Sequence, residues 1–202
     1  MTNTSTPSEA DFDLPLRCAT PAAWAAQVMS NFDQFLQDHA AAEKKASGMA
    51  LSMISHYPDR IELVDAMADL AVEEMTHFRE VIKWLHERQL QLTADTKDAY
   101  VLAMRDHIRK GKEAYFLDRL ATAAIIEARG CERFGLVADA LPEGGLKQFY
   151  KAITRSEARH YKLFLDLAIL YFGKESANQR MDELLNVEAE IILQLPINAA
   201  LH

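Results

Sequence analysis

The chain has little of what several other protein classes depend on. It contains only 2 cysteines, Cys18 and Cys131, in 202 residues, which excludes a disulfide framework and suits a chain kept reduced in the cytoplasm. It also has only 7 glycines and 6 prolines, so few positions interrupt helices. With 50% hydrophobic residues, the composition predicts an all-α protein that can bury a sizeable core.

Long apolar runs and targeting signals are also missing. The most apolar stretch, residues 163–172, is interrupted by Asp166 and is too short to span a bilayer. Residues 1–13 are polar and acidic, without the basic start and apolar run of a signal peptide. We therefore expect no membrane partner, a cytoplasmic location, a flexible tail over residues 1–18 and a single domain over residues 19–202.

The most informative feature that is present is a pair of Glu-x-x-His motifs, each about thirty residues after another glutamate. The i, i+3 spacing puts carboxylate and imidazole on one helix face, where they can share a metal ion. Four glutamates and two histidines in this pattern are the ligand set of a carboxylate-bridged di-metal site in a four-helix bundle. The six candidate metal ligands are Glu43, Glu74, His77, Glu127, Glu157 and His160.

A proline lies midway between the two glutamates of each pair. Pro58 lies 15 residues after Glu43 and 16 before Glu74, and both distances to Pro142 in the second pair are 15. Because proline does not continue a helix interior, we expect each proline in the turn of a helical hairpin. The paired glutamates would then lie at one height, roughly 22 Å from the turn, and two hairpins can place six ligands in one plane.

The ligand positions also fall on apolar helix faces. Leu63, Leu70, His77 and Trp84 recur every seven residues, and the faces that carry the other ligands are similarly apolar. One isolated motif of this kind is more often a solvated surface pair. A glutamate on an apolar face carries a large desolvation cost if unpaired, so the matched set of six favours metal ions.

These patterns predict a ferritin-like antiparallel four-helix bundle with a long crossover connection and additional N- and C-terminal helices. The expected bundle helices cover residues 31–55, 59–88, 113–140 and 143–172; shorter helices cover residues 21–29, 97–110 in the connection, and 176–195.

Carboxylate and imidazole ligands with open positions suit Fe or Mn, whereas glutamate-rich sites without thiolates are less typical of structural zinc. Two Fe(II) ions held close together can reduce O2 to an oxidant that abstracts hydrogen from carbon. Ferritin- and rubrerythrin-like proteins use nearly the same ligands. The alternative function is therefore iron storage or peroxide removal. A metal-free helical interaction module is a third interpretation, which the carboxylates on apolar faces disfavour.

Longer strings around the ligands are more specific. Residues 42–46 (Ala-Glu-Lys-Lys-Ala), 127–134 (Glu-Ala-Arg-Gly-Cys-Glu-Arg-Phe) and 155–160 (Arg-Ser-Glu-Ala-Arg-His) resemble the bacterial tRNA 2-methylthio-isopentenyladenosine hydroxylases of the MiaE type. The resemblance extends over roughly residues 30–170.

This resemblance implies a non-haem di-iron monooxygenase that hydroxylates the isopentenyl side chain of a modified adenosine in tRNA, with the six residues as ligands of two Fe ions and O2 as co-substrate. The chain has no flavin or iron–sulfur motif, so a separate reductase would supply the electrons. Ser156 precedes Glu157 where many di-iron oxygenases have an aspartate that orients a ligand histidine. The group that orients the histidines here is open.

The net charge of −8 argues at first sight against a nucleic-acid partner. Two bound Fe(II) ions would halve it, however, and basic residues cluster in the fourth bundle helix and in the connection, where they can contact phosphates. Solvated helix faces are the alternative interpretation. The candidate tRNA contacts are Arg105, Arg109, Lys110, Lys112, Lys151 and Arg155.

Three residues near the ligands have alternative interpretations. His39, one turn before Glu43, is either solvated or a hydrogen-bonding partner of that ligand. Glu73 is an alternative ligand to Glu74, but it is rotated off the ligand face. Cys131 either lines an oxygen pocket or is a small core residue. The other histidines, His56, His86, His107 and His202, are expected to be solvated or to cap helices.

Overall fold

The structure is a computed structural model that describes residues 12–202, and within these residues the chain forms helices and no strands. The helices are α1 (Ala22–Ser30), α2 (Phe32–His56), α3 (Ile61–Glu87), α4 (Ala99–Arg105), α5 (Lys112–Ala140), α6 (Gly145–Phe172) and α7 (Lys174–Gln194). The predicted all-α, ferritin-like architecture with a crossover and terminal helices is confirmed, and the helix boundaries of the bundle agree within two residues.

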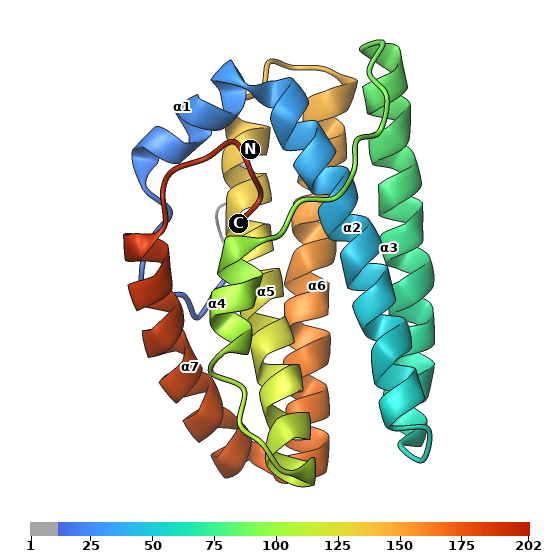
Figure 1. Cartoon of the computed structure of the whole chain (residues 1–202), viewed down its shortest axis with the longest axis vertical. Coiled ribbons are helices and arrows are strands. Elements are labelled where there is room, and N and C mark those ends of the chain that lie inside the picture. The colour runs from blue at the N-terminus through green and yellow to red at the C-terminus, as the bar shows by residue number, and fades with distance from the viewer. Residues whose placement is uncertain (1–11) are drawn as a thin grey trace, which may run out of the picture.

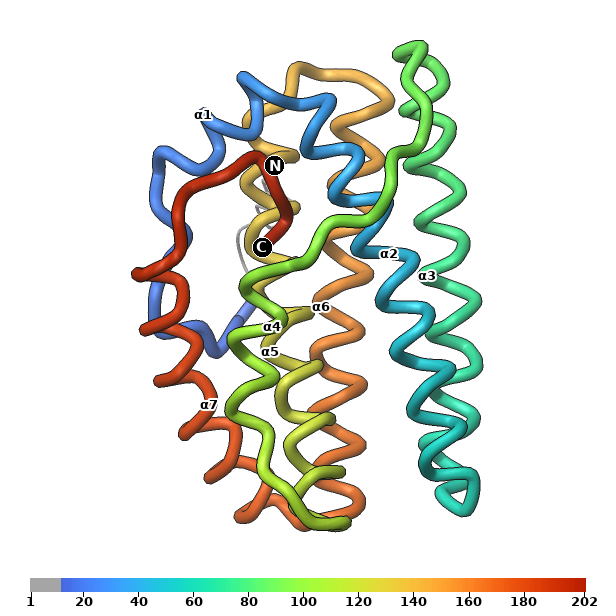
Figure 2. Tube along the Cα trace, in the orientation of Figure 1, coloured from blue at the N-terminus to red at the C-terminus, as the bar shows by residue number. Residues whose placement is uncertain are grey.

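Two antiparallel hairpins, α2–α3 and α5–α6, form the bundle (Figure 1). Pro58 lies in the turn of the first hairpin and Pro142 in the turn of the second, as their spacing predicts. The crossover from α3 to α5 runs along the bundle, so the second hairpin starts at the opposite end (Figure 2). The helix predicted for residues 97–110 is shorter than expected, because α4 ends at Arg105 and Gly111 turns the chain with φ of +102°.

The remaining helices pack unevenly around the hairpins. α7 lies against α5 and α6, α1 contacts α5 and α2, and α4 lies against α5 and α7 (Figure 1). The backbone of α3 contacts that of α6, whereas no Cα atoms of α2 and α5 among the described residues come within 8 Å of each other. At the upper end, the rings of His39 and Phe134 still bring these two helices into side-chain contact. The bundle is therefore closed on its α3–α6 side and open between α2 and α5.

The apolar core is divided into two clusters, a lower and an upper one in the view of Figure 1. On α3, Leu70 belongs to the lower cluster and Val81 to the upper one, with Glu74 and His77 between them. The other bundle helices likewise carry their candidate ligands between the two clusters. The polar layer is thus shielded from water above and below by apolar side chains.

A buried ionic network fixes α4 and α7 to α5. Arg129 Nε and Nη2 donate to Glu188 Oε1 and Oε2 at 2.8 and 3.0 Å, and both side chains are fully buried. Tyr100 Oη of α4 donates to Glu188 Oε1 at 3.2 Å. Arg129 Nη1 donates to Thr20 Oγ1 at 3.1 Å, which brings the segment before α1 into the same network.

The predicted flexible tail falls only partly within the described residues, because residues 1–11 lie outside them. Residues 12–18 contain no helix, but they contact the helices. Arg17 forms an ion pair with Asp182 of α7, and the carbonyl of Cys18 accepts a hydrogen bond from Arg129 Nη2 at 2.8 Å. Among the described residues, no helix combines the length and the hydropathy needed to cross a bilayer.

Candidate metal centre

The polar layer between the two apolar clusters contains all six candidate ligands. Within two groups, one donor atom from each residue lies within 4.8 Å of the others. Glu74 belongs to both groups, so the two sets share a carboxylate. The first group is Glu43, Glu74, His77 and Glu157, and the second is Glu74, Glu127 and His160.

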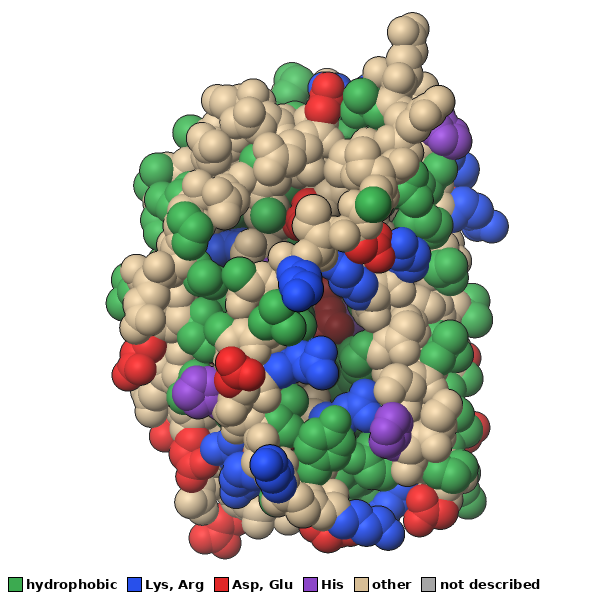
Figure 3. Space-filling model, in the orientation of Figure 1, with side chains coloured by type: hydrophobic (Ala, Val, Ile, Leu, Met, Phe, Trp, Pro, Cys, Tyr) green, Lys and Arg blue, Asp and Glu red, His purple; other side chains and the backbone are tan. Residues whose placement is uncertain are grey.

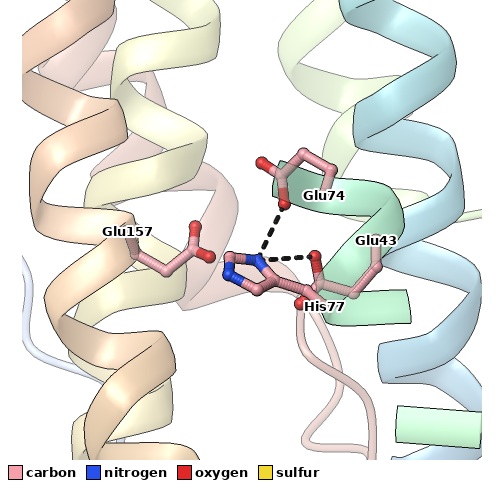
Figure 4. A group of neighbouring side chains, drawn as sticks. All are labelled: Glu43, Glu74, His77 and Glu157. Atoms are coloured by element: carbon pink, nitrogen blue, oxygen red, sulfur yellow. Dashed lines mark hydrogen bonds and ion pairs between the residues drawn. The ribbon is translucent and has the colours of Figure 1, made fainter. Parts of the chain in front are cut away.

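Figure 4 shows the first group. Glu157 reaches from α6 toward His77, while Glu43 and Glu74 approach from the α2–α3 hairpin. His77 Nδ1 lies 3.2 Å from Glu74 Oε2 and 3.6 Å from Glu43 Oε2. Burial lowers the pKa of His77, but these two carboxylates raise it more, to about 9. The imidazole is therefore placed where positive charge is strongly favoured.

His160 occupies the corresponding position in the second group. Its Nδ1 lies 3.1 Å from Glu74 Oε1, 3.7 Å from Glu127 Oε2 and 4.0 Å from Glu157 Oε2. Burial lowers the pKa of His160, but the surrounding carboxylates, Glu127 first, raise it well above its usual range. Burial and the neighbouring Glu127 carboxylate raise the pKa of Glu157 well above its usual range.

The residues of this layer fit a pair of divalent cations. The four glutamates are at most 6% exposed, and carboxylates so close together are costly to ionise without a counter-charge. Neither ring nitrogen of His160 has a hydrogen-bond partner among the described residues, because its close carboxylate contacts lack hydrogen-bond geometry. A cation at Nδ1 would satisfy that nitrogen and neutralise the carboxylates, and this oxygen- and nitrogen-rich donor set suits Fe or Mn.

Glu73 holds the far side of both imidazoles. Its Oε2 lies 3.3 Å from His160 Nε2, and its Oε1 lies 3.8 Å from His77 Nε2. Ser156 Oγ donates to Glu73 Oε1 and lies 3.4 Å from His77 Nε2, and Arg159 Nη2 donates to Glu73 at 2.7 Å. The contact with His160 lowers the pKa of Glu73 to about 2, although burial opposes this.

Glu73 is therefore the group that orients the two histidines, in place of the aspartate that many di-iron oxygenases have at the position of Ser156. It is rotated off the ligand face, as predicted, and belongs to neither ligand group. Its carboxylate instead faces the Nε2 atoms, which leaves both Nδ1 atoms directed at the glutamate cluster. Such outer partners fix the tautomer and orientation of metal-binding histidines.

His39 is a partner of Glu43 and is not solvated. The side chain is fully buried, its Nε2 lies 2.6 Å from Glu43 Oε1, and its Nδ1 lies 3.1 Å from Tyr150 Oη. The i, i+4 spacing to Glu43 was the sequence signal for this contact. Cys131 is a buried core residue whose Sγ donates to the Thr154 carbonyl at 3.3 Å. It lines a separate small cavity of about 160 Å³.

A larger cavity of about 580 Å³ leads to the candidate metal centre through the gap between α2 and α5. Glu43, Glu74, Glu127 and Glu157 lie along its inner end. Figure 3 shows the opening as a hollow with acidic side chains at depth and basic side chains around its rim. The apolar walls include Met49, Val101, Ile108, Ala123 and Ile126, and the basic lining residues are Lys45, Arg105 and Arg119.

The predicted tRNA contacts do not form one surface in the structure. Arg105 lines the large cavity, whereas Arg109 is paired with buried Asp118 at 2.7 Å. Lys151 lines the smaller cavity. Lys110, Lys112 and Arg155 are exposed and outside the large cavity lining. Lys45 and Arg119 were not predicted, because only the folded helices bring them next to α4.

The fold and the cluster define a ferritin-like helical protein with a carboxylate- and histidine-lined site that is compatible with metal ions. The profile of one family, tRNA-(ms2io6A)-hydroxylase (MiaE), matches residues 8–202. The chain belongs to this family, as the strings around the ligands predict.

Individual relatives agree with the family assignment. The tRNA 2-(methylsulfanyl)-N(6)-isopentenyladenosine(37) hydroxylase of Pseudomonas putida is 34% identical over 92% of this chain and 90% of its own length. The hydroxylase of the same description from Salmonella typhimurium is 30% identical over 88% of this chain and 83% of its own. A solved structure, Protein 43 with aldehyde deformylating oxygenase activity from Synechococcus, has a TM-score of 0.87 and 31% identity, covering 93% of this chain and 94% of that chain.

Proposed function

We propose that this protein is a di-iron monooxygenase that hydroxylates the isopentenyl side chain of 2-methylthio-isopentenyladenosine in tRNA with O2 and two electrons from a separate reductase. Family membership and the two hydroxylases similar along most of the chain support the substrate. The observation that carries the proposal is the cavity that joins the surface to the glutamate cluster. A tRNA substrate also implies the cytoplasm as the place of action.

Two iron ions would be bound by the two groups of glutamates and histidines in the polar layer. Glu43, Glu74, His77 and Glu157 form one set of donors, and Glu74, Glu127 and His160 form the other. Bound iron would supply the activation of O2. Glu73 orients the imidazoles, and the two apolar clusters shield the layer from water above and below.

The cavity suits an apolar substituent on a charged polymer. Its aliphatic walls can take the isopentenyl group, while Lys45, Arg105 and Arg119 line the same opening and can contact RNA phosphates. Arg105 is exposed and makes no ion pair among the described residues. Iron storage offers no comparable reason for an apolar cavity with a basic rim.

The substrate can be tested directly by mass analysis of tRNA nucleosides. In a strain that lacks this protein, 2-methylthio-isopentenyladenosine should accumulate without its hydroxylated form, and the wild-type protein should restore the product. Glu74→Gln should not restore it. Normal hydroxylated product in the deletion strain would contradict the tRNA substrate. Purified protein should also be offered an aldehyde, because turnover of the aldehyde but not the tRNA would favour the activity named for the Synechococcus protein.

The rim can be tested separately by tRNA affinity. Arg105→Glu should weaken binding and reduce its salt dependence, since a phosphate contact releases counterions. Lys83→Glu, at an exposed position of α3 outside the cavity, is the matched control with the same charge change. Equal effects of the two variants would reject the rim as the tRNA contact surface.

A further inference from the structure

The segment after α7 runs back over the helices and ends beside α4 (Figures 1 and 2). Its last two residues, Leu201 and His202, line the large cavity. Three side chains hold its backbone. Trp24 Nε1 donates to the Ala200 carbonyl at 3.1 Å, Arg133 Nη1 donates to the Leu201 carbonyl at 2.7 Å, and the Leu201 amide donates to Asp38 Oδ2 at 2.7 Å. The residue that follows, His202, is therefore fixed in place.

The His202 side chain is oriented by contacts on two sides. It is 6% exposed and stacks on Tyr100, with ring centroids 4.9 Å apart and an interplanar angle of 16°. Its Nδ1 lies 3.1 Å from Asp98 Oδ2. Asp98 is in turn fixed as the N-cap of α4, where its side chain accepts from the Val101 amide at 2.9 Å. Tyr100 is anchored by Glu188 of the buried network.

These contacts determine which nitrogen is available to a ligand. Burial raises the pKa of Asp98, but His202 and the Val101 amide lower it more, to about 2. Asp98 is thus a carboxylate at neutral pH and requires a proton on Nδ1 of His202. In the neutral imidazole, Nε2 is then a hydrogen-bond acceptor. This atom is buried, has no partner among the described residues, and belongs to a residue that lines the cavity.

We infer that His202 Nε2 recognises the modified base by accepting a hydrogen bond from its exocyclic N6–H. The inference rests on the proposed function. Substitution by the isopentenyl group leaves one N–H on the base, at the exocyclic nitrogen that carries the side chain, whereas the ring nitrogens N1, N3 and N7 are acceptors. A neutral imidazole matches this single donor. His202 would hold N6 in the cavity wall while the side chain extends toward the carboxylates.

A substrate analogue isolates this contact. Anticodon stem–loop RNAs would carry the isopentenyl group either on N6–H or through an ether oxygen at the same position. One hydrogen bond predicts that the wild-type protein binds the N6–H form about three- to tenfold more tightly. His202→Phe should bind both RNAs equally, and His202→Gln, which restores an acceptor, should regain part of the preference. His107→Phe is the control, because His107 is exposed and outside the cavity lining.

Asp98→Asn gives a second measurement that does not remove the ring. Asparagine preserves the helix cap but can donate to Nδ1, which moves the ring proton to Nε2 and should also abolish the preference. An unchanged preference for N6–H in His202→Phe or, if that variant does not fold, in Asp98→Asn would overturn the inference. Hydroxylation of the N6–H RNA by the wild-type protein is measured first, so a failure of the proposed function is recognised separately.

Discussion

Metal ions should stabilise this protein strongly, because its clustered carboxylates lack another counter-charge of sufficient size. The four glutamates are at most 6% exposed, and the donor atoms of each ligand group lie within 4.8 Å of one another. A ligand that binds only the folded state adds about 2.7 kcal/mol at one hundred times its Kd, so two sites add roughly 5 kcal/mol. At about 2–4 °C per kcal/mol for a chain of this size, Tm should rise by roughly 10–20 °C.

The assay is thermal unfolding under anaerobic conditions, with chelator and then with excess Fe(II) or Mn(II). Glu74→Gln should lose most of the rise in Tm, because Glu74 contributes to both ligand groups. Glu87→Gln, at an exposed position of the same helix, should keep it. A wild-type Tm that does not respond to metal, or a full response in Glu74→Gln, would refute the two-cation interpretation.

Three further predictions concern one residue beside the candidate metal ligands and two buried acidic residues with their arginine partners elsewhere in the fold. Glu73→Gln should weaken metal affinity about 10- to 100-fold while all direct ligands remain, as measured by competition with a chelator. Arg129→Met should lower the free energy of unfolding by about 3–5 kcal/mol because it leaves Glu188 buried and unpaired; in denaturant titrations, Arg129→Met with Glu188→Leu should be much less destabilised than the single variant. Asp118, held by arginines that lower its pKa against the effect of burial, should stabilise the fold above about pH 4 and lose that contribution as pH falls through its lowered pKa, so the stability deficit of Asp118→Asn should shrink in acid.

Much of the fold follows from local sequence features. Few helix breakers, prolines midway between paired glutamates and apolar repeats are enough to predict the bundle, because each feature acts within one helix or one hairpin. The length of α4 was overestimated, since a short helix in a connection depends on its neighbours. Tyr100 is its anchor, and the partner Glu188 is 88 residues away, a separation at which helical periodicity carries no information.

The six candidate ligands were easier to predict than the residues around them. They could be selected from the sequence because each Glu-x-x-His motif repeats a local spacing, and the structure brings all six together. The residues that orient them were harder, because Glu73 contacts His160 across two helices and His39 had only its spacing to Glu43 to distinguish it. Of the basic rim, the sequence indicated Arg105 but not Lys45 or Arg119, since the three residues lie on three different helices.

The layer of candidate ligands is closed on one side and open on the other, because α3 packs against α6 whereas the backbones of α2 and α5 stay apart. On the side where α3 meets α6, Glu73 faces the Nε2 atoms and is itself paired with Arg159. On the other side, α2 and α5 stay apart and leave the cavity, whose outer wall comes from α4 and the segment after α7. The bundle thus carries the ligands, and segments outside the bundle define what reaches them. Substitutions in this outer wall, such as at Asp98 or His202, should change substrate preference while the response of Tm to metal remains, because no candidate ligand lies there.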